Sequence, residues 1–189
     1  SVNVIAACKV KGRDTLLRDM NKGLDLCEKS LNMYLETKRK AFPRFYFISN
    51  ASLLDILSNG YDPQCVQKHF GDCFDGITKL EFEKGDDGEF TRNAIGMHSK
   101  TGDEYVPWRE KFTCEGAVED WLVRLVKHHA NMLSMDMEEA KRTADHWEIE
   151  KKRHEWLFDY CAQIALTASQ VLWTEEVGVA FDAFADGNE

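Results

Sequence analysis

The segment Arg13–Ala41, RDTLLRDMNKGLDLCEKSLNMYLETKRKA, decides the fold class. Its apolar residues recur at alternating spacings of three and four, which predicts a heptad-like stripe on one face of an α-helix: Leu17, Met20, Leu24, Cys27, Leu31 and Tyr34. Leu16 and Leu35 widen the stripe, as expected for a helix packed in a bundle. Phe42-Pro43 ends the helix, because the residue before proline is disfavoured in the α region. The segment therefore predicts a mainly α-helical fold.

Shorter helices are predicted after the aromatic run Phe42–Ile48. The pair Ser49-Asn50 offers N-cap candidates for a helix that continues through Leu57. Asp62-Pro63 then begins another helix, with Asp as the cap and Pro in the first turn, and this helix ends near Gly76.

A small antiparallel sheet is predicted next. Leu80–Glu83 alternates apolar and polar residues, and Gly85–Gly88 and Lys100–Asp103 are typical of hairpin turns. We expect three short strands, roughly at 78–84, 90–98 and 104–108. A sheet this small is not stable alone, so it must pack on helices.

The helical pattern returns after Gly116. One apolar stripe contains Val118, Leu122, Leu125 and Met132. The highly charged stretch Asp136–Glu155 is interpreted as a solvated helical face or a connection. A last apolar helix is expected from Tyr160 through Ile164, Leu166, Trp173, Val177, Ala180 and Phe184.

These patterns predict a mainly α, elongated helical bundle with a small three-strand β insertion. We divide residues 1–189 into a long helix with short helices (1–77), the β insertion (78–108) and a helical bundle (115–187). We expect one fragment of a larger protein, because Ser1 is not Met and the last helical pattern runs almost to Glu189.

Composition limits the partners. The net charge of −9 argues against nucleic acid and against an anionic membrane surface, since both repel an acidic chain. No stretch approaches the roughly 20 apolar residues of a membrane-spanning helix. Six widely and irregularly spaced cysteines favour reduced thiols.

No motif supports catalysis or a cofactor. The sequence has neither a phosphate-binding loop nor a catalytic elbow. Cys65, His69 and Cys73 are spaced by four, but three ligands on successive turns do not complete a tetrahedral metal site, so we favour packed side chains. A solvated face is favoured for the similarly spaced His146, Glu150 and His154. We therefore expect no enzyme in this chain by itself, and no catalytic, cofactor-binding or metal-binding residues.

The stretch Leu31–Asn50, LNMYLETKRKAFPRFYFISN, closely resembles the linker of dynein heavy chains. The resemblance continues over nearly the whole chain in the family's order, through Leu53–Ser58, Asp62-Pro63, Gly96-Met97-x-Ser99 with Gly102 and Glu104, Val118–Leu122, Ala162-Gln163 and Trp173-Thr174. Trp173–Phe181 is more similar to axonemal outer-arm chains, notably the beta type, than to cytoplasmic ones. Cys161 departs from the pattern, because the family often has Pro before Ala-Gln.

The resemblance implies a mechanical role. In this family the linker is a helical rod across a ring of AAA+ ATPase modules, and its straightening supplies the power stroke along microtubules. We expect a force-transmitting linker segment, with ATP and Mg in the ring of the parent chain and no cofactor here. The implied partners are the AAA+ ring of the same heavy chain, other dynein subunits and, only through the parent, microtubules. The implied location is the cytoplasm, cytoskeleton and axoneme of a cilium or flagellum.

Two alternatives are a passive helical scaffold or adaptor that binds other proteins, and a metal-binding or thiol-dependent enzyme domain. The residues that we expect to serve packing or mechanics are Gly23, Phe42, Pro43, Arg44, Phe45, Tyr46, Phe47, Trp121, Gln163 and Trp173. The run Phe42–Phe47 is interpreted as a joint rather than a ligand platform. The candidates for a projecting hairpin that contacts the ring are Met97, Ser99, Gly102 and Glu104.

Overall fold

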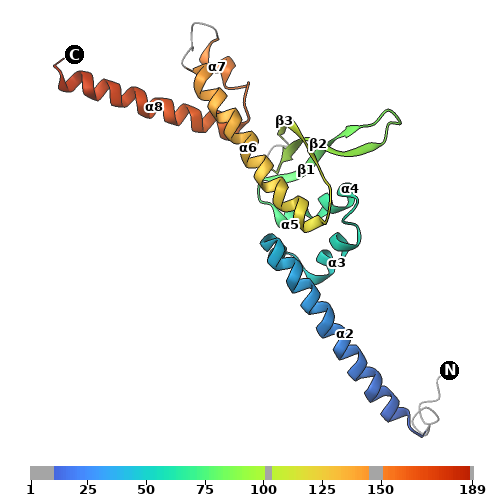
Figure 1. Ribbon diagram of the computed structural model, residues 1–189. Coiled ribbons are helices and arrows are strands. Elements are labelled where there is room, and N and C mark those ends of the chain that lie inside the picture. Colours follow the sequence, from blue (N-terminus) through green and yellow to red (C-terminus); the bar gives the residue numbers. More distant parts are fainter. Residues whose placement is uncertain (1–10, 101–103, 145–150, 188–189) are drawn as a thin grey trace.

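The structure, a computed structural model, describes residues 11–100, 104–144 and 151–187 and is mainly helical with one three-stranded sheet (Figure 1). Its elements are α2 (Arg13–Ala41), the 3₁₀ helix η1 (Pro43–Phe47), α3 (Asn50–Ser58), α4 (Pro63–Val66), the 3₁₀ helix η2 (Gln67–His69), α5 (Phe70–Cys73), β1 (Ile77–Lys84), β2 (Phe90–Ser99), β3 (Tyr105–Thr113), α6 (Val118–Ala144), α7 (Arg153–Trp156) and α8 (Ala162–Ala185).

Local signals set the helix ends in the first half. Helix α2 has the predicted bounds, and the Ser49 side chain caps α3 by accepting a hydrogen bond from the backbone N–H of Ser52. Asp62 caps α4 in the same way, through the backbone N–H of Gln64. The single helix predicted between Asp62 and Gly76 is instead a run of three short pieces, α4, η2 and α5.

The sheet has the order β1-β2-β3, and both pairs are antiparallel. Its buried side chains include Leu80, Phe82, Ala94, Met97, Val106 and Phe112. The predicted end of the third strand at Trp108 is wrong. Ala94 pairs with Phe112 and Gly96 with Pro107, so β3 has extra residues opposite this step of β2. The next buried residue of β3 after Trp108 is therefore Phe112. This irregularity hides the period-two pattern.

The described core forms two clusters, and α6 belongs to both. The larger cluster joins the short helices, the sheet and the first half of α6 around Phe45, Phe70 and Trp121. The second joins the end of α6 to α7 and α8, and its buried members are Ala140, Ala144, Trp156, Ile164, Ala168 and Leu172. The small side chains on both helices allow α6 and α8 to approach closely. Cys161 packs against both clusters.

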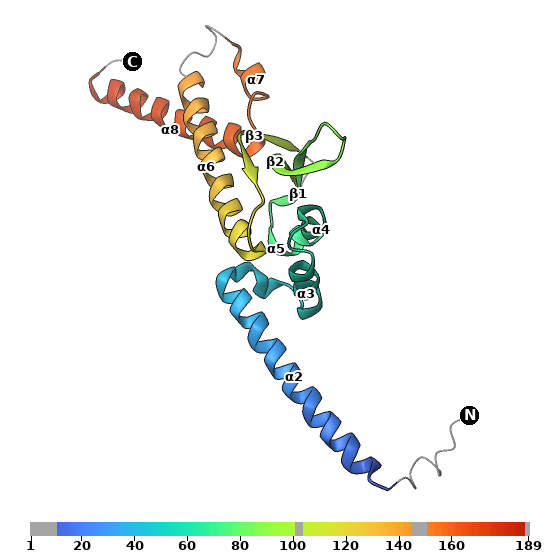
Figure 2. The ribbon, with the colours of Figure 1, turned by 45° about the vertical axis from the view of Figure 1, so that its right-hand side comes forward.

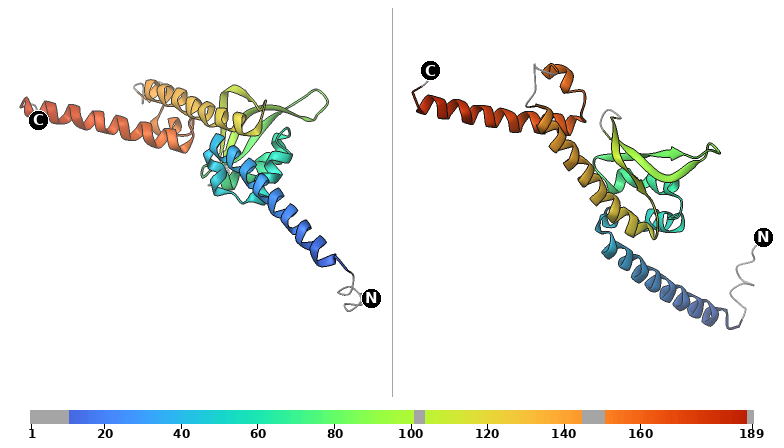
Figure 3. Two further views of the ribbon diagram at one scale, coloured as in Figure 1. Left: turned by 60° about the horizontal axis from the view of Figure 1, so that its bottom comes forward. Right: turned by 45° about the horizontal axis from the view of Figure 1, so that its top comes forward.

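Helices α2 and α8 extend away from this body in different directions (Figures 1 and 3). The expected elongated bundle is not confirmed, because the predicted α2 stripe is exposed in the described part of the chain; Leu24, for example, is 67% exposed. On α8 the large apolar residues Leu166, Trp173, Val179, Phe181 and Phe184 are also exposed. Among the described residues, no helix has both the length and the apolar character required to cross a membrane.

Candidate functional site

The aromatic run predicted to be a joint lies where α2 turns into the body. Phe42 and Phe45 are buried with their ring centroids 5.0 Å apart, and Phe42 also lies 6.2 Å from Phe74. The Arg44 guanidinium donates to the Cys73 carbonyl at 3.2 Å and stacks over the Phe74 ring.

Pro43, Tyr46 and Phe47 are exposed. The run therefore has a buried side that packs against α5 and an open side that offers two aromatic rings.

Polar contacts tie the last turns of α2 to this joint. The Arg39 side chain donates to the Phe45 carbonyl at 3.4 Å and to Asn50 Oδ1 at 2.6 Å. Lys38 Nζ lies 2.5 Å from Glu119 Oε1 at the start of α6, and this hydrogen bond raises the pKa of Lys38. The direction of α2 is thus set near its C-terminal end.

Trp121, Gly23 and Trp173 lie in different surroundings. Trp121 is fully buried in α6, and its indole N–H donates to the Gly60 carbonyl at 3.4 Å. Gly23 lies in the exposed middle of α2, and Trp173, 63% exposed, lies on α8. Trp121 belongs to the same core cluster as Phe42 and Phe45 of the joint, whereas Gly23 and Trp173 lie outside that cluster.

The hairpin candidates meet the end of the chain. Met97, Ser99 and Glu104 line a cavity of about 390 Å³ together with Gln163 and with His129 of α6. Glu104 Oε1 accepts a hydrogen bond from the backbone N–H of Ala162 at 2.8 Å, which caps α8.

Met97 is buried between Leu80 and Val106, whereas Ser99 and Glu104 are half-buried. Gly102 lies outside the described residues. The hairpin that extends from the body in Figure 2 is the one between β1 and β2, whereas Glu104, just before β3, contacts the start of α8.

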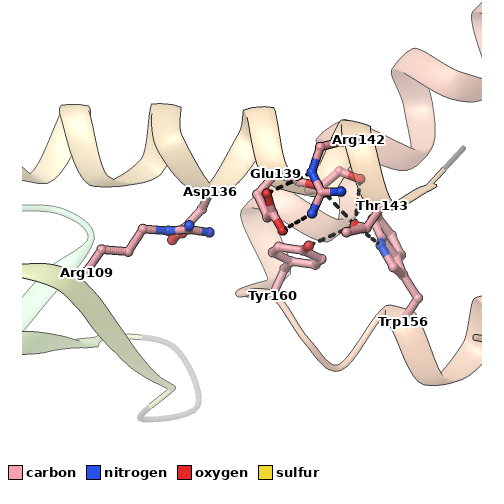
Figure 4. Close-up of polar contacts among 8 residues, drawn as sticks. Arg109, Asp136, Glu139, Arg142, Thr143, Trp156 and Tyr160 are labelled. Atoms are coloured by element: carbon pink, nitrogen blue, oxygen red, sulfur yellow. Dashed lines mark hydrogen bonds and ion pairs between the residues drawn. The ribbon is translucent and has the colours of Figure 1, made fainter. Parts of the chain in front are cut away.

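A second hollow lies on the other side of Glu104. This groove of about 530 Å³ lies between the 104–109 end of β3, Asp136 of α6 and residues 158–161 before α8. Arg109 Nε donates to Asp136 Oδ1 at 2.7 Å and joins β3 to α6 across it (Figure 4). The wall opposite is fixed by Thr143, whose Oγ1 lies 2.8 Å from both the Tyr160 hydroxyl and Trp156 Nε1.

Sequence reasoning missed this groove. The charge of Asp136–Glu155 predicts a solvated helical face or a connection, yet its part up to Ala144 continues α6 and buries Ala140 and Ala144. Ala140 and Ala144 are four residues apart and therefore share one helix face, and Trp156 follows in the sequence. This spacing could have predicted a buried face within the charged stretch.

Cys65 and His69, which are spaced by four with Cys73, have separate partners. Cys65 Sγ lies 3.2 Å from Asp62 Oδ2, and His69 Nε2 lies 2.7 Å from Asp55 Oδ2. Cys73 is buried, which raises the pKa of its thiol to about 11. Over residues 11–100, 104–144 and 151–187, no three His, Cys, Asp or Glu side chains are arranged to hold a metal ion. His146 and Glu150 lie outside these ranges, and His154 is exposed.

Comparison with known proteins gives the family. The sequence model described as "Dynein heavy chain, N-terminal region 2" matches residues 1–140. The chain belongs to this dynein heavy chain family. Over 187 residues, 99% of the chain, it is 44% identical both to human dynein axonemal heavy chain 9 and to the dynein beta chain of the flagellar outer arm of Chlamydomonas reinhardtii. It is 46% identical to pig dynein axonemal heavy chain 11 over 92% of the chain.

This dynein heavy chain segment spans about 4% of the length of these relatives. The match over residues 1–140 includes the joint, the sheet and most of α6. The identity to the axonemal chains also covers α8, so both core clusters belong to the shared sequence.

Proposed function

We propose that this chain is a force-transmitting segment of the dynein linker, the mechanical element that couples ATP hydrolysis in an adjacent AAA+ ring to movement along microtubules. One observation carries the proposal: α6 is a single 27-residue helix whose residues belong to both core clusters. It is joined to α2 by Lys38–Glu119 and packs against α8 through Ala140 and Ala144. A load on α2 therefore has a continuous path to α8.

The remaining parts of the motor belong to the parent chain. ATP and Mg are bound in its AAA+ ring, and contact with microtubules and other dynein subunits is made through it. The relatives named as axonemal, ciliary and flagellar outer-arm chains support a location in the cytoskeleton of a cilium or flagellum, and the outer-arm beta type in particular.

The 99–104 end of the sheet is proposed as a contact with the ring. Ser99, Gly102 and Glu104 are its candidate residues, with Met97 supporting them from the core. Because Glu104 caps α8, a force on this end reaches α8 directly. Deletion of Lys100–Asp103 in the full-length heavy chain is expected to alter motility while the helices stay folded. Loss of the whole fold would show instead that this end is part of the core.

The force path is tested by breaking α6 between the two clusters in the full-length heavy chain. Ser134 is exposed and lies between Met132 of the first cluster and Ala140 of the second. Ser134→Pro interrupts the helix at a local cost of about 3 kcal/mol. ATPase turnover should persist while microtubule gliding slows severely, and Ser134→Ala should leave both unchanged.

Hydrogen exchange of the two clusters shows whether each stays folded in the Pro variant. Normal gliding with a broken α6 would refute force transmission. If gliding stayed normal while other dynein subunits no longer co-purified, the passive scaffold would be the better explanation.

A further inference from the structure

Apart from Glu104, the lining of the groove between β3, α6 and the chain before α8 takes no part in the proposed force path. Its open lining is rich in aromatic rings, from Tyr105, Trp108, Phe158 and Tyr160. We propose that it holds a segment of the same heavy chain, from outside these 189 residues, that carries Lys or Arg beside an apolar residue.

The charge of the lining selects a basic occupant. Glu104, Asp136 and Asp159 face a single guanidinium, that of Arg109. Lys151 pairs with Asp159 from outside the groove. With Arg109 and Lys151 both counted, the three carboxylates exceed the cations by one. Glu104 is that carboxylate, since its described partner is a neutral backbone N–H. Walls of low dielectric strengthen its attraction for a cation.

The aromatic rings select an apolar neighbour for that cation. Phe158 lines the groove and is 88% exposed. Covering its phenyl ring with an apolar side chain would remove apolar surface from water, which is favourable. Tyr105 and Tyr160 add ring faces that attract a cation.

Trp108 lines the groove with its apolar ring. It is only 8% exposed, and within the described residues its indole N–H has no hydrogen-bond acceptor. A buried donor without an acceptor costs free energy. Because the indole nitrogen is itself buried, a segment in the groove would meet the apolar ring of Trp108 and not its N–H.

The size of the groove favours an intramolecular occupant. A hollow of about 530 Å³ accommodates only a few side chains, whereas a stable interface with a separate protein buries a much wider surface, roughly 1,000 Å² or more. A segment of the same polypeptide binds at a high effective concentration and needs less contact. Because the chain spans about 4% of the length of its relatives, most of such a heavy chain is available to supply it.

The walls are fixed before anything binds. Arg109 is held by Asp136, and Tyr160 is held by Thr143, which also accepts from Trp156 (Figure 4). Little conformational entropy is therefore lost in the lining on binding.

The test is site-specific photo-cross-linking in the full-length heavy chain, with benzoylphenylalanine in place of Phe158. The control carries the same group in place of Phe184, another exposed phenylalanine (73%) at the far end of α8. We expect position 158 to cross-link to a peptide of the same heavy chain with Lys or Arg next to the attached residue. Cross-linking to another subunit, to a peptide without a basic residue, or at the yield of position 184 would overturn the proposal.

A charge variant tests the chemistry. Glu104→Gln keeps an oxygen for the Ala162 N–H and removes only the charge, so it should lower the yield at position 158 about three-fold to ten-fold. An unchanged yield would rule out a charge-selected occupant. The inference rests on the chain being part of a longer heavy chain and not on force transmission, so cross-linking and the gliding assay of Ser134→Pro can fail separately.

Discussion

Lys38 near the end of α2 and Glu119 in the first turn of α6 form an ion pair, with Nζ 2.5 Å from Oε1. The Lys38 side chain is 22% exposed and that of Glu119 is 10% exposed. The pair joins residues 81 positions apart and fixes α2 to the body beside buried Leu35.

Removal of the Lys38 charge should therefore destabilise the chain. Lys38→Met leaves the Glu119 carboxylate buried without a cation, at a cost of about 2–3 kcal/mol, below the range for fully buried pairs because Lys38 is partly exposed. Adding Glu119→Leu should recover most of this loss, since no buried charge then remains. Urea unfolding measures the free energy of unfolding of both variants. A double variant less stable than Lys38→Met would contradict this account.

A methyl group at Gly96 should disrupt the sheet. A Cβ at this position would lie 2.7 Å from the Val106 carbonyl oxygen and 2.7 Å from the Tyr105 ring, and the backbone oxygen has little room to move. Gly96→Ala should cost about 2 kcal/mol. Gly71→Ala is the matched control, because a Cβ there meets no atom within 4 Å, and it should be neutral or stabilising. Equal melting temperatures for the two variants would show that β3 adjusts freely.

We propose that α2 bends at Gly23, which lies in the exposed middle of the helix. A Cβ at Gly23 meets no atom within 4 Å, so Gly23→Ala changes only the stiffness of the helix, by about 1 kcal/mol in local stability. If α2 bends there during the stroke, the variant should slow microtubule gliding by the full-length heavy chain without changing the stability of the body. Unchanged gliding velocity would remove Gly23 from the mechanism.

Stability should fall below about pH 6.5. Burial lowers the pKa of His128 and His129 from the ordinary value of 6.5, and the neighbouring His128 lowers that of His129 further. The folded chain then binds fewer protons than the unfolded chain below that pH, so the free energy of unfolding decreases as the pH falls. Urea unfolding at about pH 7.5 and about pH 5.5 measures the difference.

His129→Phe should reduce this pH dependence, because its aromatic ring does not titrate. His154→Gln, at an exposed position, should retain it. The same pH dependence in His129→Phe as in the parent chain would exclude His129 as a source.

The described cysteines should differ sharply in reactivity. Cys27 is exposed on α2, whereas burial raises the pKa of Cys73 to about 11 and that of Cys114 to about 12. The thiolate is the reactive form, so maleimide at about pH 7.5 should label Cys27 first and the two buried thiols only after unfolding. Peptide mapping by mass spectrometry gives the order. Early labelling of Cys114 would indicate that the larger cluster opens readily.

The features predicted correctly from the sequence depend on neighbouring residues. The bounds of α2 follow from its own periodicity and from Phe42-Pro43, and the caps Ser49 and Asp62 act on residues two or three positions away. Such signals lie within one short stretch of chain.

The features that were missed depend on distant partners. The contacts Arg109–Asp136 and Glu104–Ala162 join residues that are 27 and 58 positions apart. The sequence around one residue of such a pair does not indicate which distant residue will be its partner. The α2 stripe shows the same limit, since its period marks an apolar face but does not say what covers that face.

The attachment of α2 at one end has a mechanical consequence. The helix is about 44 Å long at 1.5 Å per residue, and the ties to the body described above come from its last turns. It is a cantilever: a sideways push near Arg13 produces a bending moment at Leu35 and Phe45, whereas an equal pull along the axis produces almost none. The joint would then respond to the direction of a load as well as to its size.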